Sequence, residues 1–253
     1  MVNLIFAAEQ ALKGLTKSVG HEPTSAVILV AGKSTRTGGK TTKQLTEIDG
    51  IPVAVRTLMK FQASEVIDEI IVVAAKDEIP LYSEFKEQYG LDKIKKVIEG
   101  GDSRAESAKK GFYAIDRKAK YVAIHDGARC AVTIKQIESV VREAYSHGAA
   151  IAATRSTDTV KRADKDGFVA KTIDRRTVWR AQTPQVFLKK MYEVALAKAG
   201  DKYIYATDDA MLAEASGFKV KLVECGDSNI KITFPEDFER VRHIINSEED
   251  PAK

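Results

Sequence analysis

Short runs of apolar, often β-branched residues alternate along the chain with segments whose apolar residues recur every three or four positions. The first pattern is typical of strands buried on both faces, and the second of helices with one buried face. The predicted strands are Ser25–Ala31, Ile67–Ala74, Lys95–Ile98, Tyr121–Ile124, Ala149–Ala153 and Val220–Val223. The predicted helices are Val53–Gln62, Leu81–Tyr89, Ala105–Ile115 and Ile134–His147, with a last helix after residues 229–237. This alternation predicts an α/β fold with a doubly wound, mostly parallel sheet.

The segment Arg155–Arg176 breaks this pattern because it is polar and has a turn signal at Asp166-Gly167. Scattered apolar or β-branched positions within it predict a two-stranded hairpin. A hairpin this polar cannot supply its own core, and isolated hairpins are marginally stable in water. We therefore expect the hairpin to lie on another surface, and a second subunit is the simplest candidate.

Length and composition fit one large domain: the chain has 253 residues, of which 44% are hydrophobic and 30% charged. The 40 basic and 36 acidic residues are mixed without long runs of one charge, so nucleic acid is not an expected partner. No apolar run approaches the roughly 20 residues that span a bilayer, so no membrane association is expected. Two cysteines, Cys130 and Cys225, lack metal-ligand spacing and are too few for a disulfide framework. We expect a reduced, cytoplasmic protein.

The chain divides into three regions in this interpretation. Residues 1–24 form an N-terminal extension with loose helical spacing, in which Glu9 interrupts the apolar stretch. No basic leader precedes that stretch, so we do not expect a signal peptide. Residues 25–247 form the domain, including the hairpin 155–176 as an arm, and residues 248–253 form a C-terminal tail.

The loop after the first predicted strand is rich in glycine, hydroxyl and basic side chains between Gly32 and Gln44. Glycines let backbone N–H groups turn toward an anion, so the loop predicts a polyphosphate site, with a solvated surface loop as the alternative. Residues 34–41 nearly match the Walker pattern, but Ser34 takes the place of its first glycine. Gly50 and Pro52 also prevent the long helix that a Walker loop requires, which argues against that interpretation.

Two further segments follow predicted strands. Gly100–Ser107 opens a helix at a place where a base would be read, although Asp102 could also simply cap that helix. Asp126 lies just beyond a buried strand, where a carboxylate suits Mg²⁺ or substrate hydroxyls; a helix-capping role is the alternative. Lys231, taken alone, reads as a solvated surface lysine.

The motifs, taken in order, resemble a known family. A-G-x-x-x-R, K-Q-L and D-G-x-P resemble the signature of the sugar-nucleotide pyrophosphorylase superfamily. The set G-G-D-S-R-x-x-S, H-D-x-A-R, T-I-D-R, Q-T-P-Q-x-F and N-I-K-x-T resembles the 2-C-methyl-D-erythritol 4-phosphate cytidylyltransferases of the non-mevalonate isoprenoid pathway, from about Ala26 to the last helix. The resemblance implies a Rossmann-like nucleotidyltransferase that moves CMP from CTP to that acceptor and releases pyrophosphate. It also implies Mg²⁺ and a homodimer formed through the hairpin arm.

The resemblance also implies roles for individual residues. The catalytic group is Arg36, Lys43 and Lys231, which would hold the triphosphate, together with Arg175. The nucleotide would be recognised by Ala31, Gly32, Gly101, Asp102, Ser107 and Asp126. The acceptor would be bound by Asp126, Arg129, Thr183 and the partner's arm, which carries Thr159, Lys161 and Arg175. The metal would be held by the CTP phosphates, with Asp126 as a further candidate ligand.

Five positions depart from the family's usual pattern. Ser34 replaces a glycine, Thr42 a proline, Gly127 an alanine and Cys130 a proline, and Val30 stands where a small alanine is usual. None of these changes removes a charge that the mechanism requires. They leave affinity and rate as the quantities to test.

Three alternatives remain at this point. A ribitol 5-phosphate cytidylyltransferase would share the nucleotide loop but differ near Thr172–Arg176 and Trp179. A glycosyltransferase-like sugar-nucleotide binder would usually carry D-x-D where this chain has His125-Asp126-Gly127. An inactive dimeric regulator would have no reason to retain the full set of charged residues.

Overall fold

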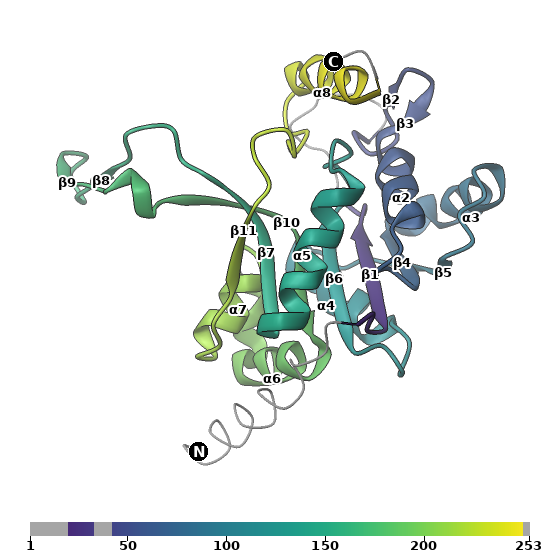
Figure 1. Cartoon of the computed structure of the whole chain (residues 1–253), viewed down its shortest axis with the longest axis horizontal. Helices are drawn as coiled ribbons and strands as arrows, with labels where there is room; N and C mark the ends of the chain where they lie inside the picture. The colour runs from purple at the N-terminus through teal and green to yellow at the C-terminus, as the bar shows by residue number, and fades with distance from the viewer. Residues whose placement is uncertain (1–19, 33–41, 250–253) are drawn as a thin grey trace.

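The computed structural model describes residues 20–32 and 42–249. A seven-stranded sheet in the order β11-β7-β10-β6-β1-β4-β5 forms its centre, with helices on both faces (Figure 1). The strands are β1 (Thr24–Leu29), β4 (Glu69–Ala74), β5 (Ile94–Glu99), β6 (Tyr121–Asp126), β7 (Ala149–Arg155), β10 (Trp179–Leu188) and β11 (Lys221–Glu224). The helices are α2 (Val53–Ala63), α3 (Ile79–Gln88), α4 (Arg104–Ala114), α5 (Ile134–His147), α6 (Lys189–Ala199), α7 (Asp209–Ala215) and α8 (Glu236–Glu249). Two short strands, β2 (Glu47–Ile48) and β3 (Ile51–Pro52), form a separate hairpin.

The predicted α/β fold with a mostly parallel sheet is confirmed. Each predicted strand and helix forms within a few residues of its expected bounds. The strands β1, β4 and β6 are buried at every position, as their continuous apolar runs predict. Strand β1 pairs in parallel with both β4 and β6, so the carboxyl ends of these three strands meet at one edge of the sheet. The sheet begins at Thr24, inside the segment assigned to the N-terminal extension; the first 19 residues of that segment lie outside the described residues.

The strand β10 was not predicted, because its residues were interpreted only as a motif. It runs antiparallel between β6 and β7, near the middle of the sheet. Pro184 argues against a central strand because proline cannot donate to the ladder. The register shifts between Ala181 and Gln185, so Pro184 falls in an irregular stretch where the regular ladder is already interrupted. The helices α6 and α7 that follow were also not predicted.

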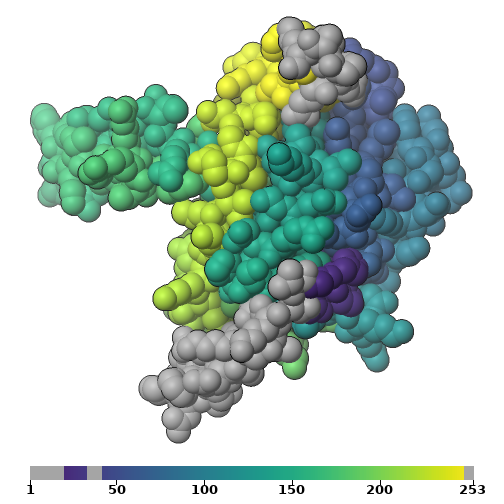
Figure 2. Space-filling view, viewed as in Figure 1, coloured from purple at the N-terminus to yellow at the C-terminus, as the bar shows by residue number. Residues whose placement is uncertain are grey.

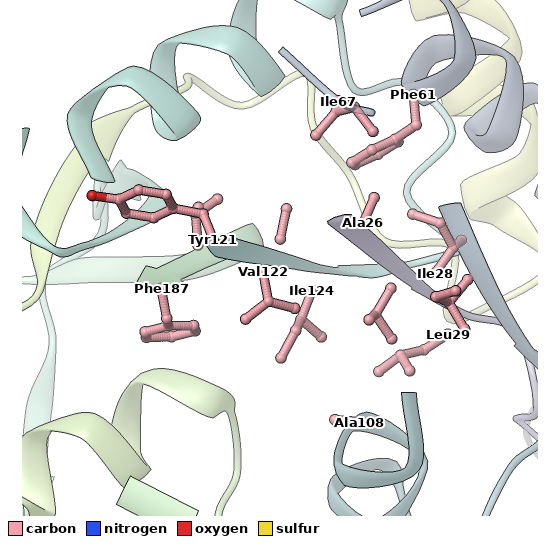
Figure 3. Packing of buried hydrophobic residues seen from close by; sticks show 14 of the residues in the cluster. Ala26, Ile28, Leu29, Phe61, Ile67, Ala108, Tyr121, Val122, Ile124 and Phe187 are labelled. Carbon is pink, nitrogen blue, oxygen red and sulfur yellow. The ribbon is translucent and has the colours of Figure 1, made fainter. Parts of the chain in front are cut away.

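The core lies on both faces of the sheet (Figure 3). Phe61 of α2 lies on one side of the strands, and Phe187 and Ala108 lie on the other. Tyr121 packs on Tyr145 of α5 with ring centroids 4.8 Å apart, while Phe187 stacks on a tyrosine of α6. Within residues 20–32 and 42–249, every helix is too short or too polar to span a bilayer.

The predicted hairpin arm projects from the body of the protein (Figures 1 and 2). It consists of β8 (Lys161–Ala163) and β9 (Val169–Thr172), which pair antiparallel across the predicted turn. Gly167 supports that turn with a φ of +88°, a conformation that glycine adopts at little cost. Every residue of both strands is exposed, and Phe168 is 72% exposed. Within one chain the arm therefore has no core of its own.

Two of the unusual positions compensate each other. A Cβ atom added to Gly127 would lie 2.4 Å from Cγ1 of Val30 and 3.0 Å from the carbonyl oxygen of Leu29. Val30 is fully buried, so its larger side chain occupies the space that an alanine at position 127 would need. Valine at position 30 adds volume that glycine at position 127 gives up, so the two changes form one compensating pair.

We expect Gly127→Ala to destabilise the protein by about 1–3 kcal/mol, because overpacking a tight core forces neighbouring atoms to move. The double variant Val30→Ala/Gly127→Ala should recover most of that loss, since it removes the closest overlap. Denaturant unfolding of both single variants and the double variant measures the coupling. Additive effects of the two substitutions would contradict the compensation.

Candidate active site

Most residues assigned to the nucleotide follow the carboxyl ends of β1 and β5, the two strands on either side of β4. The chain leaves β1 at Ala31 and Gly32, and it leaves β5 at Gly100 and Gly101. A Cβ atom added to Gly100 would lie 2.6 Å from the Cβ of Ala31 and 2.9 Å from Oγ of Ser107. Two of the sequence motifs therefore meet within a few ångströms at the carboxyl edge of the sheet, where open α/β sheets bind ligands.

The helix α4 is capped by Ser103, not by Asp102. The Ser103 hydroxyl accepts a hydrogen bond from the Glu106 amide at 3.1 Å, and the Glu106 carboxylate accepts one from the Asp102 amide at 2.8 Å. The Ser107 hydroxyl accepts from the Gly101 amide at 3.0 Å. This arrangement corrects the capping interpretation of Asp102 and leaves its exposed side chain outside the cap.

Asp126 is the electrostatic centre of the site. Its Oδ1 accepts a hydrogen bond from Nε of Arg104 at 2.9 Å, and its Oδ2 accepts one from Nζ of Lys231 at 2.8 Å. Nε of Arg129 lies 3.9 Å from Oδ2, within ion-pair distance. Burial alone would raise the pKa of the Asp126 carboxyl, but Arg104, Lys231 and Arg129 together hold it well below its usual range. Asp126 therefore pairs with cations, and the alternative that it merely caps a helix is wrong.

Lys231 reaches Asp126 because the segment around it is fixed to the sheet. The Ile232 amide donates to the carbonyl of Ala128 at 2.9 Å. Arg129 donates from Nη1 to the carbonyl of Asn229 at 2.7 Å. The Asn229 side chain donates in turn to the carbonyl of Thr183 at 2.8 Å. These bonds hold the segment between β11 and α8 against β6 and β10, so Lys231 is not a solvated surface lysine.

Thr183 and His125 form a buried support that the sequence did not single out as a pair. The Thr183 hydroxyl lies 3.1 Å from the amide of Asp126, which donates to it, and 3.0 Å from Nδ1 of His125. His125 also packs on Phe61, with ring centroids 4.9 Å apart. The pKa of His125 is lowered to about 3, and burial is the largest cause of this shift. A neutral imidazole therefore holds the hydroxyl beneath Asp126.

Two hollows of about 250 Å³ each open at this edge. The inner pocket is lined by Arg104, Asp126, Arg129, Ala181, Gln182, Thr183, Gln185, Thr207, Asp208 and Lys231. The outer pocket is lined by Arg129, Thr154, Arg180, Ala181, Gln182, Asp227, Asn229, Ile230, Lys231 and Arg240. Together their linings carry five cationic and three carboxylate side chains. That surplus of positive charge suits ligands with several negative charges.

The structure brings some of the predicted residues together and separates others. Asp126, Arg129, Thr183 and Lys231 line one pocket. The arm residues Thr159, Lys161 and Arg175 are exposed and line neither pocket of their own chain. Arg36 lies outside the described residues.

Lys43 lies outside both linings, but the side chain of its neighbour Gln44 approaches Gly32 just after β1. The segment that holds it is fixed on both sides. The Ala54 amide donates to the carbonyl of Gln44 at 2.9 Å, and Thr42 donates to Glu78 at 3.0 Å.

Several pocket residues were missed by the sequence analysis: Arg104, Arg180, Gln182, Gln185, Thr207, Asp208, Asp227 and Arg240. Arg104 stands inside one of the motifs, and Gln182 and Gln185 flank Thr183 in another. The motifs were therefore recognised, but their roles were assigned to neighbouring residues. Thr207 and Asp208 precede α7, a helix that was not predicted.

The pKa of His125 predicts how stability depends on pH. Its folded-state pKa of about 3 lies below the ordinary value of 6.5, so the unfolded chain binds a proton that the folded chain does not. The stabilisation is fully present above pH 6.5 and is lost as the pH falls toward 3. Between pH 7.5 and 5 this group should cost about 2 kcal/mol of unfolding free energy. Between these pH values the unfolding free energy, measured with denaturant, should fall less in His125→Asn than in the wild-type protein. An equal fall in both proteins would contradict the assignment.

Comparison with known proteins agrees with this geometry. The family model described as IspD, 2-C-methyl-D-erythritol 4-phosphate cytidylyltransferase, matches residues 24–247. The enzyme of that name from Caldanaerobacter subterraneus subsp. tengcongensis is 42% identical over 214 residues, which cover 84% of this chain and 94% of that relative. The one from Syntrophus aciditrophicus is 38% identical over 225 residues, covering 88% and 96%.

Solved structures agree as well. The crystal structure of 4-diphosphocytidyl-2C-methyl-D-erythritol synthase from Anaerococcus prevotii superimposes with a TM-score of 0.80 at 32% identity, covering 90% of this chain and all of that one. The Francisella tularensis 2-C-methyl-D-erythritol 4-phosphate cytidylyltransferase gives a TM-score of 0.72 at 29% identity, covering 88% and 100%. With its cation-lined edge, its arm and these matches over nearly its whole domain, the chain belongs to the 2-C-methyl-D-erythritol 4-phosphate cytidylyltransferase family.

Proposed function

We propose that this protein transfers CMP from CTP to 2-C-methyl-D-erythritol 4-phosphate, giving 4-diphosphocytidyl-2-C-methyl-D-erythritol and pyrophosphate. The observation that carries the proposal is the convergence of Arg104, Arg129 and Lys231 on Asp126, beside a pocket at the carboxyl edge of the sheet. The names of the relatives supply the two substrates. Pyrophosphate release from CTP and this acceptor, with ATP, GTP and UTP as controls, tests it; no release with CTP would contradict it.

The reaction needs no side-chain nucleophile. An oxygen of the acceptor phosphate attacks the α-phosphorus of CTP, the bond from that phosphorus to the bridging oxygen breaks, and pyrophosphate leaves with the electron pair. Both substrates are polyanions, so the protein must position them and offset their repulsion. In this proposal Ala31, Gly32, Gly101, Asp102 and Ser107 hold the nucleotide at one end of the edge.

The remaining residues divide between the phosphates and the acceptor. The triphosphate lies against Arg36, Lys43 and Lys231, whose charges stabilise the transition state. The acceptor enters the inner pocket, where Asp126 and Thr183 meet its hydroxyl groups beside Arg129. Lys231 lines both pockets, which suits a residue that contacts both reacting phosphates.

Mg²⁺ belongs to the proposal as a partner of the triphosphate. The described residues contain no group of three or more His, Cys, Asp or Glu side chains that could hold a metal ion. Asp126 already accepts hydrogen bonds from two cationic side chains, so the phosphate oxygens would be the main ligands of the metal. When bound, Mg²⁺ lowers the charge on the leaving pyrophosphate.

The arm is assigned to a homodimer in which each arm completes the pocket of the partner. Phe168 and Val169, which are 72% and 65% exposed, offer apolar surface that a second copy would cover. Thr159, Lys161 and Arg175 line neither the inner nor the outer pocket of their own chain, which supports a role in the pocket of another. Arg175 would then contact the phosphate of the acceptor.

We expect Lys231→Ala to lower kcat by about 10²–10³, because it removes one preorganised cation from the transition state. The KM values should change less than kcat, since the residue acts mainly on the transition state. Steady-state assays measure both parameters. Lys189→Ala is a matched control, because that lysine donates to the carbonyls of Asp116 and Arg117 and lines neither pocket. Wild-type turnover in Lys231→Ala would remove this lysine from the mechanism.

Mixing two impaired variants tests whether Arg175 serves the partner. Arg175→Ala should weaken binding of the sugar phosphate and change CTP affinity little. If Arg175 acts across the dimer, a mixture with Lys231→Ala contains heterodimers with one intact site. Random mixing of subunits should then restore roughly a quarter of wild-type activity. No recovery, with heterodimers verified by native mass spectrometry, would place Arg175 in the site of its own chain or outside any site.

A further inference from the structure

Arg104 joins Asp126 to a second buried acidic group, Asp209. It is the first residue of α4, and its guanidinium spans two carboxylates that lie far apart in the sequence. Its Nε donates to Oδ1 of Asp126 at 2.9 Å, and its Nη1 donates to Oδ2 of Asp209 at 2.8 Å. A planar guanidinium can bridge two acceptors in fixed directions, whereas a lysine ammonium cannot reproduce this fork.

Asp209 is itself anchored, so it fixes the far end of Arg104. It is 2% exposed, and its second oxygen accepts from the Tyr192 hydroxyl at 2.6 Å. The amide of Asp209 donates to Oε1 of Gln185 at 2.9 Å. Tyr192 in turn lies in the core, against Phe112 and Phe187. Arg104 is therefore held on its far side by a carboxylate that core packing fixes, in addition to its bond to Asp126.

This anchoring has a consequence for Lys231. Arg104 bonds Oδ1 of Asp126, and Lys231 bonds the other oxygen, Oδ2, at 2.8 Å. Arg104 also shares the negative charge of Asp126, so the carboxylate holds Lys231 less strongly. A lysine held in place by a partly neutralised carboxylate can turn to a phosphate without losing a strong buried ion pair.

We propose that Arg104, held by Asp209, is a positioning residue that keeps Lys231 correctly placed and available for the phosphates during transfer. The inference rests on the proposed function, because it gives Lys231 its role in that reaction. Arg104 acts through Asp126 and needs no contact with the reacting atoms. Without it, Asp126 can turn both oxygens toward Lys231 or Arg129, and the lysine is drawn away from the transferring phosphate.

A graded set of variants tests this chain of contacts. We expect Arg104→Met to lower kcat by about 10–100-fold, less than loss of a direct donor, with the KM for CTP nearly unchanged. Arg104→Lys should recover part of kcat, since a lysine reaches one carboxylate but not both. Asp209→Asn should reduce kcat less than Arg104→Met does, and Tyr192→Phe should reduce it less than Asp209→Asn. Glu69→Gln is the control: Glu69 is also buried and hydrogen-bonded, by Ser25 and the Asp116 amide, and it lines neither pocket.

The control separates positioning from support of the fold. Melting temperatures are measured for every variant. A structural role would lower the melting temperature of Arg104→Met and of Glu69→Gln alike while leaving kcat of the folded enzyme unchanged. A positioning role lowers kcat only in the Arg104 series.

The decisive measurement is a double-mutant cycle with Lys231→Ala. If Arg104 acts by placing Lys231, then Arg104→Met should cost little further kcat once the lysine is gone. Independent, multiplicative losses in the cycle, or wild-type kcat in Arg104→Met, would overturn the inference. A wild-type protein without CMP transfer would instead contradict the proposed function, so the two failures are distinguishable.

Discussion

The structure of the site depends on the attraction between one carboxylate and three cationic side chains. Two like unit charges about 4 Å apart repel by roughly 4 kcal/mol at the effective dielectric constant near a protein surface, so cations gather only where an anion compensates them. Asp126 supplies that compensation to Arg104, Arg129 and Lys231, which come from three separate parts of the chain. The cations are thereby placed before a substrate arrives, and binding does not have to bring them together.

The sheet explains why Asp126 stands where it does. Parallel pairing brings the ends of β1, β4 and β6 to one edge, and the inserted antiparallel strand β10 completes that edge with Gln182, Thr183 and Gln185. The same strand begins at Trp179, at the base of the arm. Arg155 of β7 lies over the Trp179 ring at 4.4 Å and joins the two strands at this point. One strand therefore carries both pocket residues and the attachment of the arm.

Much of the sheet and part of the site could be predicted from the sequence. Continuous apolar runs identified β1, β4 and β6, and Asp126 and the glycine-rich segments could each be located just after a predicted strand. Lys231 could be placed only through the family resemblance, because a lysine 105 positions from Asp126 has no local signal of its role.

The elements and residues that the sequence did not predict were missed for physical reasons. The strand β10 contains buried polar residues that bond to backbone and side chains across the site, so it lacks the alternation that reveals a strand. Gln185, for example, accepts from the amides of Asp209 and Ala210. Arg104 was overlooked because an arginine in the first turn of a helix is ordinary; only the fold shows that two carboxylates from other elements meet it. The arm was predicted as a hairpin, but what covers it depends on a second molecule.

The exchange of volume between positions 30 and 127 constrains how such a sequence can evolve. A lineage that passes between alanine at both positions and the present valine and glycine must change one residue first. Valine beside alanine at position 127 would press atoms together, whereas alanine beside glycine leaves only a small void. The order of mutational steps is therefore restricted: glycine arrives first, and a substitution that is harmless in this background would be harmful in a close relative.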